Sequence, residues 1–126
     1  MALNPEEWLR QSDYDFDSAE FMHEGGRHFY AAFMSHLAVE KALKGLFIKR
    51  TGDFPPRTHN LLFFVNTLEL APPEVVGTFL VKLNEVNVTT RYPEELEVVQ
   101  KTYTKDSVAV LIRRTREALA WIKQQY

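Results

Sequence analysis

The chain has 126 residues, a formal net charge of −2 and no cysteine. The absence of cysteine excludes disulfides and thiolate metal ligands, and so small a net charge gives no general reason to bind nucleic acid. A hydrophobic fraction of 45% with nine Phe is enough for one core, so we expect residues 1–126 to form a single domain.

The first helix is predicted from the segment 4–7, Asn-Pro-Glu-Glu, which supplies an N-cap, a proline in the first turn and early acidic residues. Trp8, Phe16 and Ala19 then recur at helical spacing. The helix should end at Gly25 and Gly26, because glycine adopts positive φ without strain.

The second helix is predicted from about Arg27 to Thr51, ending at Gly52. It is apolar nearly all round, which is typical of the central helix of a bundle. Gly45 and the alanines near it would let another helix pack closely, either within the chain or across a dimer.

A loop with two prolines at 55 and 56 follows, and Thr58 is expected to cap a third helix that ends near Leu70. The prolines at 72 and 73 force a break before a fourth helix at about 73–87.

Residues 87–93 are predicted to form a turn, because Thr89 and Thr90 favour extended chain and Pro93 disfavours a helix before it. Residues 94–103 are ambiguous, and a last helix is expected at about 105–125. Long helices with short connections predict an all-α fold, an up-and-down antiparallel bundle of four to five helices.

The two ends of the chain carry opposite charge. Residues 5–24 hold seven acidic residues against one basic residue, and residues 101–126 hold six basic residues against two acidic ones. Either the two terminal helices are neighbours with complementary faces, or the last helix offers a basic face to RNA.

The second helix carries one polar row. His36, Glu40 and Lys44 are four residues apart and therefore lie on one slanted face. Buried polar groups cost about 1–3 kcal/mol for each missing partner, so something must satisfy this row. It is either an internal network built on the Glu40–Lys44 pair, or a polar pocket in which Lys44 meets a phosphate.

Two other segments offer candidate phosphate ligands. The segment 57–60 contains His59 at the expected start of the third helix, where free N–H groups suit an anion. The segment 91–93 supplies Arg91, whose guanidinium fits a phosphate, and Tyr92, whose ring can stack on a base.

In this order, the motifs resemble the HEPN (higher eukaryotes and prokaryotes nucleotide-binding) family. The resemblance rests on segments 30–33 (Tyr-Ala-Ala-Phe), 36–44 (His-x-x-Val-Glu-Lys-Ala-x-Lys), 58–61 (Thr-His-Asn-Leu) and 91–93 (Arg-Tyr-Pro). It implies a bundle of four or five helices, usually a homodimer, that often acts with a minimal nucleotidyltransferase partner in toxin–antitoxin or related systems. The nucleotide- or RNA-phosphate-binding residues would be His36, Glu40, Lys44, His59, Arg91 and Tyr92.

Some members of this family are metal-independent ribonucleases that carry Arg, four to six residues, and then His. After Arg91 the corresponding positions hold Leu96, Glu97 and Val98. Cleavage through a 2′-hydroxyl needs a positioned acid or base, commonly His, so we expect no catalytic residue and no enzyme. The alternatives are a noncanonical ribonuclease that uses Arg91 with His59 or His36, and a purely structural dimeric bundle.

We expect no metal site and no cofactor. Four scattered His without Cys do not match a zinc site, and the glycines at 25 and 26 lack the Lys of a phosphate-binding loop. No apolar run approaches the ~18 residues of a membrane span, and the N-terminus does not resemble a signal peptide. We therefore expect a cytoplasmic protein with no membrane contact.

Overall fold

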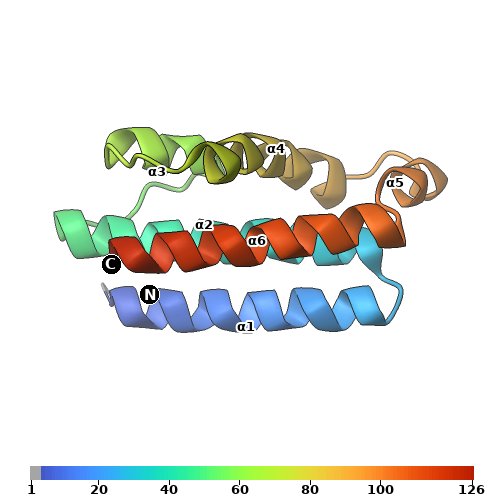
Figure 1. Cartoon of the computed structure of the whole chain (residues 1–126), viewed down its shortest axis with the longest axis horizontal. Coiled ribbons are helices and arrows are strands. Elements are labelled where there is room, and N and C mark those ends of the chain that lie inside the picture. Colours follow the sequence, from blue (N-terminus) through green and yellow to red (C-terminus); the bar gives the residue numbers. More distant parts are fainter. Residues whose placement is uncertain (1–3) are drawn as a thin grey trace.

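The computed structural model describes residues 4–126, which form helices joined by short connections and contain no strand. The helices are α1 (Pro5–Glu24), α2 (His28–Thr51), α3 (Leu61–Thr67), α4 (Glu74–Arg91), α5 (Leu96–Thr102) and α6 (Lys105–Gln125). Figure 1 shows α2 and α6 between α1 on one side and α3 with α4 on the other, and α1, α2, α4 and α6 alternate in direction. The expected all-α up-and-down bundle is confirmed, with α5 formed in the ambiguous segment.

The ends of the first two helices are those predicted. The side chain of Asn4 accepts hydrogen bonds from the backbone N–H groups of Glu6 and Glu7, at 3.0 and 3.2 Å. Gly26 has φ of 82° after α1, and Gly52 has φ of 76° after α2. Both glycines therefore provide the left-handed backbone that a chain leaving a helix commonly needs.

The predicted cap of the third helix was wrong. Asn60 is the N-cap of α3, because its side-chain oxygen accepts from the N–H of Leu62 at 3.0 Å. Thr58 makes the turn before the cap, where its hydroxyl accepts from the N–H of Asn60 at 3.1 Å. The helix is shorter than expected and ends at Thr67.

The predicted turn at 87–93 was also wrong, because α4 continues to Arg91. The hydroxyls of Thr89 and Thr90 bond the carbonyl of Val86, at 3.3 and 2.7 Å, which lets both threonines sit within the helix. Pro93 restricts only the residue before it, and that residue lies just outside the helix. Arg91 therefore belongs to the last helical turn.

Helix α2 is central, as its apolar surface predicted, and it packs against α1, α4 and α6. Its Gly45 permits the close approach of α1 and the C-terminus: an added Cβ would lie 2.9 Å from Cβ of Trp8 and would also collide with the hydroxyl of Tyr126. The close contact that the sequence left open is thus made within the chain.

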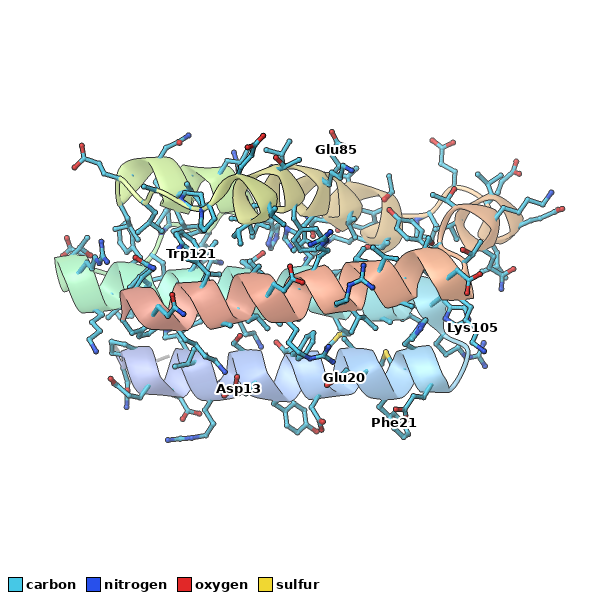
Figure 2. All side chains as sticks on the ribbon, viewed as in Figure 1. Asp13, Glu20, Phe21, Glu85, Lys105 and Trp121 are labelled. Carbon is cyan, nitrogen blue, oxygen red and sulfur yellow. The ribbon has the colours of Figure 1, made fainter. Side chains whose placement is uncertain are left out.

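The two terminal helices are neighbours with complementary charge. Arg116 lies 2.6 Å from Glu20, and Lys123 lies 2.7 Å from Asp13. Figure 2 labels Asp13 and Glu20 on α1, which lies beside α6. Within residues 4–126, no helix is both long and apolar enough to cross a membrane.

Candidate functional site

Four of the predicted site residues meet at the buried carboxylate of Glu40, which is 4% exposed. Its Oε1 lies 2.8 Å from Nδ1 of His59, and its Oε2 accepts a hydrogen bond from Nζ of Lys44 at 3.0 Å. Nδ1 of His36 lies 3.8 Å from Oε1. We call these four residues, His36, Glu40, Lys44 and His59, the Glu40 cluster. Both carboxylate oxygens are engaged, as burial of a charge requires.

The loop that carries His59 is tied to α4. The side-chain oxygen of Asn84 accepts from the backbone N–H of Leu61 at 2.8 Å, and its amide nitrogen donates to Asn60 at 3.1 Å. These bonds fix the start of α3 and so hold His59 against Glu40. Sequence reasoning missed Asn84, since only its long-range contact reveals its role.

His36 is the innermost member of the Glu40 cluster, at 1% exposure. Burial lowers the pKa of its imidazole to about 4, although the negative charge of Glu40 acts in the opposite direction. The ring is therefore neutral at pH 7. Its Nε2 is buried without a hydrogen-bond partner among the described residues. His36 thus brings an unused polar atom to the site but no positive charge.

Arg91 approaches the cluster from α4. Its guanidinium carbon lies 5.1 Å from the ring centre of Phe33, and its Nε donates to the side chain of Asn87 at 3.3 Å. Phe33 lies one turn of α2 before His36, and the positive charge of Arg91 is among the smaller causes that lower the pKa of His36. Within the described chain, Arg91 has no carboxylate partner. Asn87, four residues earlier on the helix, was missed because a turn was expected there.

Tyr92 does not join the other predicted residues. Its side chain is 77% exposed and lines a separate hollow of about 460 Å³ between the end of α4 and α5. Val88, Thr89 and Tyr103 also line this hollow. The structure therefore brings four of the six predicted residues together, places Arg91 over Phe33 near them, and puts Tyr92 at another place.

The arrangement is suited to an anion. Lys44 pairs with the single negative charge of Glu40, and the guanidinium of Arg91 over Phe33 adds a second positive charge near it, so one positive charge is in excess. His59 is half exposed, with its Nδ1 held by Glu40. No group of three or more His, Cys, Asp or Glu side chains within residues 4–126 is placed to hold a metal ion.

Comparison with known families decides the assignment. The HEPN domain model matches residues 5–125, almost the whole chain. The chain belongs to the HEPN domain family. The resemblance seen in the ordered motifs is confirmed.

Two solved structures have the same fold as this HEPN chain. TT1696 from Thermus thermophilus is 22% identical over 97% of this chain and 98% of its own, with a TM-score of 0.84. ST0689, described as an archaeal HEPN homologue, is 25% identical over 99% of this chain and 98% of its own, with a TM-score of 0.78. No curated protein matches the chain.

Proposed function

We propose that this HEPN protein binds the phosphate of a nucleotide or of an RNA, as a module that works with a partner and is not itself a catalyst. The observation that carries the proposal is that Lys44 and His59 meet at one buried carboxylate, while the cation of Arg91 lies over Phe33 on the same helix as Lys44. Lys44 comes from α2, His59 from the loop before α3, and Arg91 from α4.

The groups that remain unpaired support this proposal. The ammonium of Lys44 makes one hydrogen bond within residues 4–126, to Glu40, and so keeps two of its three N–H donors. The guanidinium of Arg91 uses only Nε in a hydrogen bond there, which leaves the planar fork that suits phosphate oxygens. His59 keeps its second ring nitrogen for a ligand.

Binding to anions can be tested with a single-stranded RNA of about ten nucleotides and with nucleotides, by calorimetry. Arg91→Gln should weaken binding about tenfold, because a phosphate contact to Arg is charge-assisted. Arg113→Gln removes the same charge from an exposed position on α6 and should leave binding unchanged. If wild type binds neither RNA nor nucleotides, or if both variants bind as wild type does, the proposal fails.

The partner is the second part of the proposal. We propose a cytoplasmic homodimer that acts with a minimal nucleotidyltransferase in a toxin–antitoxin-like pair. This part depends on family membership, because Gly45 and the apolar surface of α2 are used within the chain. Light scattering should give twice the monomer mass at micromolar concentration, and the protein should co-purify with the product of the adjacent open reading frame. A monomer that retains no such product would contradict this part.

The contact between His59 and Glu40 favours one second candidate, a noncanonical ribonuclease. A carboxylate on one ring nitrogen orients the imidazole and leaves the other nitrogen to accept or donate a proton. Arg91 would stabilise the phosphate. RNA incubated with wild type and with His59→Ala distinguishes the two functions: cleavage lost only in the variant supports the enzyme, and equal or absent cleavage removes it.

A further inference from the structure

A hollow of about 440 Å³ opens on the Lys44 side of the Glu40 cluster. It lies between the start of α1, the second half of α2 and the loop before α3, and this volume is in the usual range for small-molecule sites. Its lining residues are Trp8, Lys44, Phe54, Pro55, Pro56 and Arg57. Two of them are cations and the other four present aromatic or prolyl rings.

The positive charges of the hollow are not fully neutralised. Lys44 shares the carboxylate of Glu40 with His59. Arg57 is exposed and forms no ion pair within the part of the chain that the structure describes. Among residues 4–126, no acidic side chain lines the hollow. An anionic group in the hollow would therefore contact Lys44, which is paired with Glu40, and Arg57, which has no ion pair there.

The hollow also offers two aromatic ring surfaces, those of Trp8 and Phe54. Phe54 is 62% exposed although it is a large apolar side chain. Trp8 lines the hollow because the missing side chain of Gly45 lets it lie directly on α2, beside Lys44. The indole Nε1–H of Trp8 is buried without a hydrogen-bond partner among residues 4–126.

We infer that this hollow seats one nucleotide unit, with the base against the rings of Trp8 and Phe54 and the phosphate between Lys44 and Arg57. The inference deepens the proposed function and rests on it, because Lys44 is shared by the hollow and the Glu40 cluster. Bases stack on aromatic side chains whatever their sequence, and the cations supply the charge-assisted bonds that a phosphate needs. The same chemistry is offered by a free mononucleotide and by the phosphorylated end of an RNA.

Trp8 provides its own reporter. The chain has two Trp, and Trp121→Phe leaves Trp8 as the only one, so stacking of a base should quench its fluorescence. Adenosine 5′-monophosphate and two RNAs of about ten nucleotides, with and without a 5′-phosphate, are titrated separately. Quenching by the mononucleotide identifies a free nucleotide as a ligand, and quenching only by the 5′-phosphorylated RNA identifies an RNA end.

Variants in this background locate the two contacts. Phe54→Ala and Arg57→Gln change exposed side chains and should keep the fold, which circular dichroism checks. Each should weaken binding about tenfold, and Arg113→Gln should not.

This inference is overturned if Trp8 fluorescence is not quenched and both variants bind with full affinity. If Arg91→Gln still weakens binding in that case, the proposed function stands. No binding of any of the three ligands would overturn both.

Discussion

Nδ1 of His59 lies 2.8 Å from Oε1 of Glu40, although 19 positions separate them in the chain. This contact joins the loop before α3 to the middle of α2 and completes the hydrogen bonding of a buried carboxylate. The second ring nitrogen of His59 stays available to an anion. So do two N–H donors of the Lys44 ammonium and the terminal N–H groups of the Arg91 guanidinium. The same contact thus serves the fold and the proposed site.

Loss of the carboxylate should be costly. Glu40→Gln leaves the ammonium of Lys44, whose side chain is 11% exposed, without its counter-charge. We expect the free energy of unfolding to fall by about 3 kcal/mol, as for other buried pairs that lose one member. Urea denaturation of wild type and of Glu40→Gln measures this difference in the free energy of unfolding.

A matched pair provides the control for this prediction. Glu97 and Lys101 have the same spacing on a helix, but both side chains are more than three-quarters exposed. Glu97→Gln should therefore change stability by less than about 0.5 kcal/mol. A double-mutant cycle on Glu40 and Lys44 adds a second test: strong coupling in stability with unchanged ligand binding would favour a purely structural network.

Stability should depend on pH through His36. Its pKa is about 4 in the folded state and near its ordinary value of 6.5 in the unfolded chain, so the unfolded state binds more protons between these values. Stability is therefore lost as the pH falls below about 6.5. At about 1.36 kcal/mol per pKa unit, the fall between pH 7 and pH 5 is about 2 kcal/mol.

Other groups titrate over the same range, so this loss must be measured against a variant. Urea unfolding of wild type and of His36→Gln at both pH values isolates the contribution of His36. The variant should lose about 2 kcal/mol less than wild type. Equal losses would show that His36 is not a buried neutral ring.

Replacing each of two helical glycines, Gly45 and Gly77, with alanine should change the free energy of unfolding in opposite directions. At Gly45 a Cβ would lie 2.9 Å from Cβ of Trp8 and 3.0 Å from the carbonyl of Pro5, so Gly45→Ala should destabilise by about 1–3 kcal/mol. At Gly77 the nearest atom is Cγ of Pro72 at 3.4 Å, an ordinary contact. Gly77→Ala should stabilise by up to about 1 kcal/mol, through helix propensity.

Thermal denaturation compares these two variants directly. A stabilised Gly45→Ala would mean that α1 does not lie as close to α2 as described, and that the glycine serves another contact.

The sequence predicted what depends on neighbours along the chain. The cap at Asn4, the glycine ends of α1 and α2, and the row of His36, Glu40 and Lys44 all follow from local spacing. The end of α4 could not be predicted from local spacing. The hydroxyls of Thr89 and Thr90 donate hydrogen bonds to the carbonyl of Val86, and this overrides the preference of threonine for extended chain.

The assembly of the site depended on contacts between distant residues. The bonds from Asn84 to the start of α3, and the place of Trp8 beside Lys44, have no signature in a single sequence. Motif order indicated that His59 and Arg91 belong with Glu40, but only the tertiary structure shows that Tyr92 lies elsewhere.

The central claim is that Lys44, His59 and Arg91 act on one anion, and side-chain nitrogen NMR tests it most directly. Titration with a 5′-phosphorylated RNA should shift the signals of the Lys44 ammonium, the His59 ring and the Arg91 Nε together, with one affinity. The Nε signal of Arg113 should not move. Unmoved signals at these three residues, or shifts confined to the basic residues of α6, would contradict the account.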